Sequence, residues 1–192
     1  MRLIKSRKAL STVVTTLIIL VVSVLLATVV TFYAINATTT RVQEEYLQIT
    51  KLHVWCDSSG DALAAFVVTN VGGRDAVIEK ITIRGRAQDW SKICFWKLEE
   101  GDTLPSELVW ADSHSALNST YKKSESEYYK FFNASKLSLS ALSLRSGASM
   151  VVYIFDIDNL STSDIGVTVG VVVFTANAQY HKETNVEAYL PS

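Results

Sequence analysis

Residues 10–35 read LSTVVTTLIILVVSVLLATVVTFYAI, and no charged side chain occurs from Ala9 through Thr40. About 20 apolar residues are enough for a helix to cross the hydrocarbon core of a bilayer, and this run is longer. Basic residues tend to stay on the cytoplasmic side of a membrane span, so we expect a short cytoplasmic N-terminus and an exported remainder. The basic residues in front of the run are Arg2, Lys5, Arg7 and Lys8. We interpret the run as a membrane-borne export element and not as a core helix.

The residues at the front of this run differ from those of an ordinary secretory signal. Such a signal has about 7–15 apolar residues followed by an A-x-A-like cleavage site. Here the apolar run is longer and no good site of that kind follows it. Instead, the small residue Ala9 stands between the basic pair Arg7-Lys8 and the start of the apolar run at Leu10. The phrase RKALSTVVTTLI (7–18) resembles the class III signal peptides of archaeal type IV pilin-like proteins, and the resemblance covers roughly residues 5–35.

The resemblance implies processing and assembly. In that family a prepilin peptidase cuts after the small residue, and the apolar helix becomes the N-terminus of the mature subunit. Carried over, the processing site is Lys8, Ala9 and Leu10, with the cut between the last two. Bacterial type IV pilins usually carry a glutamate at the fifth mature position, which is Val14 here, and archaeal relatives commonly lack it. The implied product is a cell-surface filament subunit that assembles with its own copies through the helix, after insertion in the cytoplasmic membrane.

Length and charge suit this organisation. The 192 residues fit one anchor and one compact domain, and the formal net charge of −1 becomes about −5 when the four basic residues of 1–9 are removed. A chain without a basic excess is not expected to bind nucleic acid. We divide it into a signal peptide (1–9), a helix and neck (10–46) and an extracellular β-domain (47–192). Three consecutive threonines predict that the helix bends or frays at Thr38–Thr40 and resumes briefly over 41–46.

From Leu47 onward the sequence is typical of an all-β domain, with short β-rich runs separated by turn residues. Seven or eight strands favour an immunoglobulin-like β-sandwich. The run VTVGVVVFTA (167–176) is almost uniformly apolar, which predicts a central strand buried on both faces. The expected strands are 47–56, 63–70, 77–84, 90–98, 142–144, 149–156, 166–176 and 180–189.

One segment, 99–136, interrupts this pattern with charged residues, serines and tyrosines. It is too long for a simple connection in a compact domain, so we interpret it as an insertion. Residues 121–132 could form a short helix inside it. Two roles stay open, a variable binding surface or an ordered structural flap.

Two cysteines, Cys56 and Cys94, lie in the predicted exterior domain. An oxidising exterior permits a disulfide between them, and two buried cysteines without a bridge are the equal alternative. Sequons for N-glycosylation also fit an extracellular chain, although Ser/Thr-rich loops produce some by chance. The possible acceptors are Asn36, Asn118, Asn133 and Asn159.

No motif indicates catalysis, a cofactor or a resident metal. His53, His114 and His181 are far apart and lack metal-ligand spacing. The acidic cluster 156–159 is similar to the start of a calcium loop, but it lacks the glycine and the terminal glutamate of the EF-hand. We therefore expect a structural subunit of a filament used for adhesion or surface attachment, and not an enzyme. The alternatives are a monomeric membrane-anchored surface binding protein and a minor, tip-located pilin.

Overall fold

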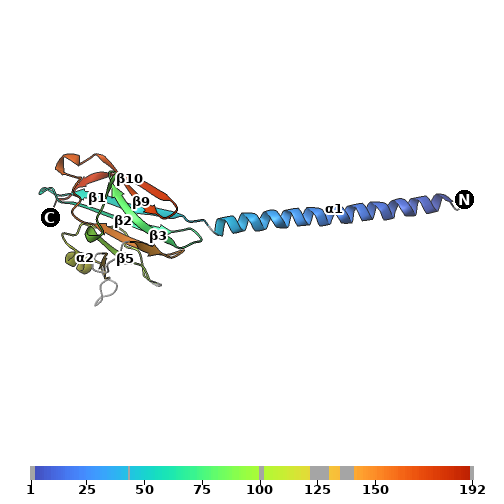
Figure 1. The fold of residues 1–192 in the computed structure, drawn as a ribbon, viewed down its shortest axis with the longest axis horizontal. Helices are drawn as coiled ribbons and strands as arrows, with labels where there is room; N and C mark the ends of the chain where they lie inside the picture. The colour runs from blue at the N-terminus through green and yellow to red at the C-terminus, as the bar shows by residue number, and fades with distance from the viewer. Residues whose placement is uncertain (1–2, 43, 100–101, 122–129, 135–140, 191–192) are drawn as a thin grey trace. The chain divides into compact units, whose positions relative to one another are not determined.

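A computed structural model of the chain describes residues 3–42, 44–99, 102–121, 130–134 and 141–190. The chain divides into two compact units, residues 1–43 and residues 44–192. The first unit contains one long helix, α1 (Leu3–Val42), and we call the second unit the head. The head is built mainly of β-strands (Figure 1).

Helix α1 is continuous through its threonines and serines, and their hydroxyls bond to its own backbone carbonyls. Thr15, Ser23, Thr28 and Thr31 each donate to the carbonyl four residues earlier, at 2.7–2.9 Å. Thr38 does the same toward Ala34 at 2.8 Å. The predicted fraying at Thr38–Thr40 is therefore wrong, since the helix runs to Val42.

Each expected strand is present in the head, within a few residues at its ends. The first half of the 90–98 run is an exception, because Asp89 accepts a hydrogen bond from the Ser91 amide and caps a 3-10 turn at Trp90–Lys92. Two short strands, β4 and β6, were not expected. The strands are β1 (Leu47–Cys56), β2 (Ala62–Asn70), β3 (Ala76–Ile83), β4 (Arg86–Ala87), β5 (Ile93–Lys97), β6 (Phe132–Asn133), β7 (Leu142–Leu144), β8 (Ser149–Ile154), β9 (Thr168–Thr175) and β10 (Gln179–Ala188).

The strands form one mixed sheet that curls into a half-barrel, in the order β4-β3-β9-β10-β1-β2-β8-β5-β6, with β7 also paired to β3. Strand β10 joins the two halves of the sheet. Residues 179–185 of β10 pair antiparallel with β9, and residues 186–188 pair parallel with β1. The immunoglobulin-like sandwich is not confirmed, while the coarser expectation of a long apolar helix followed by a β-rich domain is confirmed.

The main core lies between the two halves of the curled sheet and includes Phe66, Ile81 and Val152. Strand β9 contributes one face to this core, since Val169, Val171 and Val173 are buried while the alternate residues are half-buried. The prediction that this run is buried on both faces is therefore wrong. The uniformly apolar sequence of β9 did not mean that both of its faces are buried. A strand's own sequence does not show which other elements pack on each face.

Strand β2, like β8, is covered on both of its faces. Residues 62–68 are buried without interruption, and alternate side chains enter two different cores. The second core lies on the other face of the sheet, under the described part of the insertion, residues 102–121 and 130–134, which we call the strap. Its buried strap residues are Leu108, Ala111, Leu117, Tyr121 and Phe131.

The strap contains a short helix, α2 (His114–Thr120), at a different place from the predicted one. Ser113 caps it, because the Ser113 hydroxyl accepts a hydrogen bond from the Ala116 amide at 3.2 Å. The predicted helix at 121–132 falls largely on residues 122–129, which lie outside the described residues. The described residues of the strap pack on the sheet of the head, as expected for an ordered structural flap.

Candidate functional site

The apolar stretch of α1 is exposed along its whole described length. Every residue from Leu10 to Thr39 is solvent-exposed in the chain, with Phe32 at 69% and Tyr33 at 76%. In the part of the chain that the structure describes, this is the one helix long and apolar enough to cross a membrane. Its 30 residues span about 45 Å at 1.5 Å per residue. The expected processing site lies in the helical backbone at its start, where Leu10 is exposed.

A short non-helical segment, residues 44–46, follows α1 and is fastened to the head; we call it the neck. Backbone amides of the loop 71–73 donate to neck carbonyls at 2.9–3.1 Å, and Tyr180 Oη donates to the carbonyl of Glu45 at 3.0 Å. A Cβ atom added to Gly72 would lie 2.5 Å from neck backbone atoms. The close approach of the two backbones therefore requires glycine at this position.

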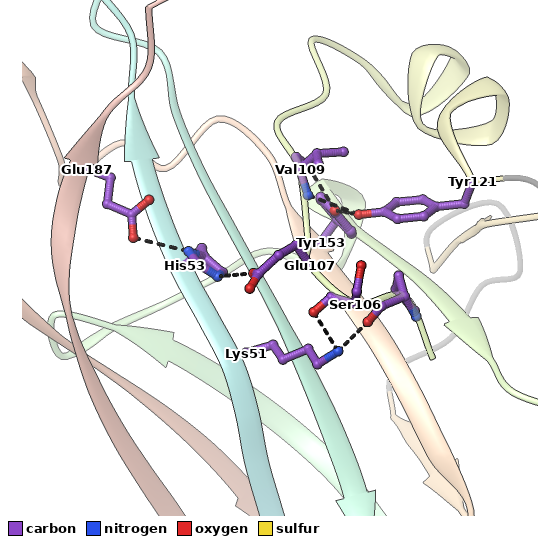
Figure 2. Close-up of polar contacts among 9 residues, drawn as sticks. Lys51, His53, Ser106, Glu107, Val109, Tyr121, Tyr153 and Glu187 are labelled. Atoms are coloured by element: carbon purple, nitrogen blue, oxygen red, sulfur yellow. Dashed lines mark hydrogen bonds and ion pairs between the residues drawn. The ribbon is translucent and has the colours of Figure 1, made fainter. Parts of the chain in front are cut away.

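A polar junction joins β1 to the strap (Figure 2). Strand β1 contains a bulge, where Lys51 has a left-handed backbone with φ of 49°. The Lys51 ammonium donates to the carbonyl of Ser106 at 2.9 Å and also to that of Pro105. The bulge thus turns a lysine out of the ladder and toward two strap carbonyls.

His53, two residues further along β1, lies between two carboxylates of different elements (Figure 2). Its Nδ1 is 3.1 Å from Glu187 Oε1 of β10, and its Nε2 is 3.4 Å from Glu107 Oε2 of the strap. The imidazole also stacks on Trp55, with ring centroids 5.1 Å apart and planes 5° from parallel. Local sequence pattern gives no partner for His53, because both carboxylates are remote in sequence.

Two buried tyrosines hold the next part of the strap. The Val109 amide donates to Tyr121 Oη at 3.0 Å, and Tyr153 Oη donates to the Val109 carbonyl at 2.9 Å. The two hydroxyl oxygens are 2.6 Å apart, so the remaining proton, that of Tyr121, points to Tyr153. Burial raises the pKa of both tyrosines above the ordinary value, most strongly for Tyr153. Both hydroxyls therefore remain neutral hydrogen-bond donors at ordinary pH.

The other two histidines do not join this junction. His114 Nε2 contacts the carbonyl of Phe131 at 2.8 Å, and His181 Nε2 is 3.6 Å from Glu183. Among the described residues, no three His, Cys, Asp or Glu side chains are placed to hold a metal ion.

The acidic cluster 156–159 is engaged by basic side chains. Lys92 Nζ is 2.6 Å from Asp158 Oδ1, and Arg86 Nη2 is 3.6 Å from the other oxygen of the same carboxylate. The hydrogen bond from Lys92 lowers the pKa of Asp158. Asp158 of the cluster therefore takes part in two ion pairs with basic side chains of the head.

Cys56 and Cys94 are both buried and are not joined to one another. Cys56 belongs to the main core and Cys94 to the second core, on opposite faces of the sheet. Their strands have β2 and β8 between them, which separates them by roughly 14 Å at the usual strand spacing. A disulfide needs Cα atoms within about 7 Å, so the structure corresponds to the alternative of two buried cysteines without a bridge. Burial raises the pKa of the Cys56 thiol, which makes it less reactive.

The possible glycosylation acceptors lie in four different settings. Asn36 is on the exposed surface of α1, and Asn118 lies in α2 with its carbonyl oxygen accepting from the Phe131 amide at 2.6 Å. The Nδ2 atoms, which would carry a glycan, donate to Ser91 O at 3.1 Å in Asn133 and to Ile83 O at 2.8 Å in Asn159. A glycan on either of the last two would compete with these hydrogen bonds.

No described protein family matches the chain, and no curated protein is similar to it. Among solved structures, it is similar to the Pseudomonas fluorescens alkylpurine DNA glycosylase AlkC bound to DNA containing an abasic site analog (14% identity, TM-score 0.28, 74% of this chain and 30% of that chain). It is also similar to the β-glucosidase from Listeria innocua in complex with glucose (10% identity, TM-score 0.27, 77% of this chain and 16% of that chain). The chain spans less than a third of the length of either protein. At these TM-scores, neither likeness supports a fold or a function.

Proposed function

We propose that the chain is a structural subunit of an archaeal type IV pilus-like surface filament, inserted in the cytoplasmic membrane and processed between Ala9 and Leu10 by a prepilin peptidase. The observation that carries this proposal is the exposed, charge-free helical stretch Leu10–Thr39, which precedes a folded head in the sequence.

The apolar stretch is not stable in water by itself. Burying an aliphatic side chain contributes about 1.5–3 kcal/mol, and large apolar side chains occur throughout residues 10–35. Their combined transfer free energy requires either lipid or other apolar helices around α1. Copies of the same helix supply such surroundings when subunits leave the membrane together.

The polar residues of α1 are compatible with both surroundings. Their hydroxyls bond to the helix backbone, so the helix can lie in lipid without unpaired donors at those positions. A helix that moves from lipid into a filament needs this tolerance. The same property suits a permanent anchor, which is why a membrane-anchored surface protein remains the second candidate.

The experiment is mass analysis of the N-terminal peptide and the intact native protein, in both the sheared extracellular fraction and the membrane fraction. The proposal expects a chain that begins at Leu10 and is recovered in filaments. An Ala9→Leu variant should remain uncut and stay in the membrane, while the matched Ser6→Ala variant should be processed like the natural chain. A chain that begins at Met1 and occurs only in membranes would refute the filament proposal. A chain cut at Leu10 but absent from filaments would refute the assembly step.

A further inference from the structure

The first part of the strap, residues 102–107, is attached to the sheet differently from the rest. Thr103, Leu104, Ser106 and Glu107 are exposed, and the contacts from β1 to this segment are those of Lys51 and His53. From Leu108 onward, buried side chains and the tyrosine pair hold the strap. A change at the β1 junction can therefore move 102–107 without opening the second core.

We propose that His53 is a pH-sensitive latch that fastens this first part of the strap to the sheet when the imidazole is protonated and loosens it when the ring is neutral. The inference does not depend on the proposed filament function. It rests on the two carboxylates that contact opposite nitrogens of one ring, from the strap and from β10.

The number of N–H groups on the imidazole determines which protonation state closes the latch. An imidazolium has two N–H groups and can donate to Glu187 and Glu107 at once, whereas the neutral ring has one N–H and one lone pair. With the neutral ring, one carboxylate faces a lone pair and is repelled. Glu187 makes the shorter contact, 3.1 Å against 3.4 Å, so the contact to Glu107 is the one that opens.

Three charged groups lie near the His53 ring, and each has a different role in the proposed latch. Glu107 faces it from the strap, Glu187 faces it from β10, and Lys51 is the nearest cation along β1. Lys51 donates to the carbonyls of Pro105 and Ser106 and keeps the segment near the sheet in both states. The latch therefore tightens when the imidazole gains its second N–H and loosens when that proton is lost.

A nitroxide on a Thr103→Cys variant tests the latch by electron paramagnetic resonance, using the full chain in detergent. The parent chain, whose two cysteines are buried, provides the labelling blank, and a second label at Ser115 of α2 reports a part that should stay fixed. Raising the pH from 5.5 to 8 should increase the ratio of mobile to immobile label at 103 about two- to five-fold, as expected for a partly exposed ion pair. The label at 115 should not change.

Three variants separate the latch from a general effect of pH. In the His53→Gln variant, the label at residue 103 should be mobile at every pH. In the Glu107→Gln variant, the label should stay immobile at every pH, because the glutamine amide can donate a hydrogen bond to the neutral ring. His181→Gln, which changes an exposed histidine that also faces a glutamate, should keep the natural profile. A flat natural profile, an unchanged profile in His53→Gln, or a profile abolished by His181→Gln would overturn the inference.

Discussion

Replacing Tyr153 by phenylalanine removes one hydroxyl from the closed hydrogen-bond circuit under the strap. The circuit contains the Val109 amide, Tyr121 Oη, Tyr153 Oη and the Val109 carbonyl, with heavy-atom distances of 2.6–3.0 Å. Without Tyr153 Oη, the Tyr121 proton and the Val109 carbonyl both lose their partner. Tyr153 is fully buried and Tyr121 is 9% exposed, so the two tyrosine hydroxyls are shielded from bulk water.

The magnitude follows from the number of polar groups that each change leaves unpaired. A buried unpaired donor or acceptor costs about 1–3 kcal/mol. Because Val109 itself is 41% exposed and its carbonyl can recover a water, we expect Tyr153→Phe to lower the free energy of unfolding by about 2–3 kcal/mol. Tyr121→Phe leaves mainly the Val109 amide unpaired and should cost about 1–2 kcal/mol. The double variant should cost less than the sum of the two, by about 1 kcal/mol, since the Tyr121 proton is lost with its ring hydroxyl.

Urea unfolding of the full chain in mild detergent, followed by near-ultraviolet circular dichroism, measures these free energies. Tyr46→Phe, at an exposed tyrosine of the neck, is the control and should change the value by less than about 0.5 kcal/mol. Strictly additive single changes, or a Tyr153→Phe cost no larger than that of the control, would refute the circuit.

The same circuit should make the free energy of unfolding depend on pH in the alkaline range. The pKa values of Tyr121 and Tyr153 are raised in the folded state, so the folded state keeps protons that the unfolded state releases. The stabilisation is fully present below about pH 10, the ordinary tyrosine pKa, and is lost as the pH rises above it. The fall in unfolding free energy above pH 10 should be less steep in Tyr153→Phe, as measured by the same assay.

Three further predictions concern the neck, the cysteines and the ion pairs. Gly72→Ala should lower the free energy of unfolding by about 1–3 kcal/mol through the neck clash, and an unchanged thermal midpoint would contradict that contact. A reductant should leave the thermal midpoint unchanged because Cys56 and Cys94 do not bridge, and alkylation of the unfolded chain without reductant should add two labels. Lys92→Met should raise the pKa of Asp158 toward its ordinary value in a carboxyl NMR titration, and no rise would disprove the pairing.

The strands could be placed from sequence because each run carries its own evidence. The β-rich run 47–56, ended by a cluster of turn residues at 57–61, predicted β1 with the bounds that the structure has, Leu47–Cys56. Which strand has both faces covered depends on remote residues such as Leu117, and the polar segment around that leucine has no periodicity. The second core was therefore invisible to local pattern reasoning.

The candidate site could be predicted only in part for the same reason. The apolar run 10–35 was evident from composition, because a helix long enough to cross a membrane can be recognised without knowing its partners. His53 was noticed, but its two carboxylates depend on a bulge in β1 and on the parallel register of β10. One signal in the sequence could have been used. Residues two apart on a strand point to the same face, so His53 shares a face with Trp55, and Glu187 shares a face with Tyr189.

The parallel pairing of β1 with β10 has a consequence for the order in which the strands of the head can pair. Val54 pairs with Val186, which is remote in the sequence, so this contact cannot form before both segments are available. Until then β1 keeps an unpaired edge, and contacts so remote in sequence form slowly. We expect the head to depend on the hairpin of β1 and β2 for its early structure, with the pairing of β1 and β10 formed late.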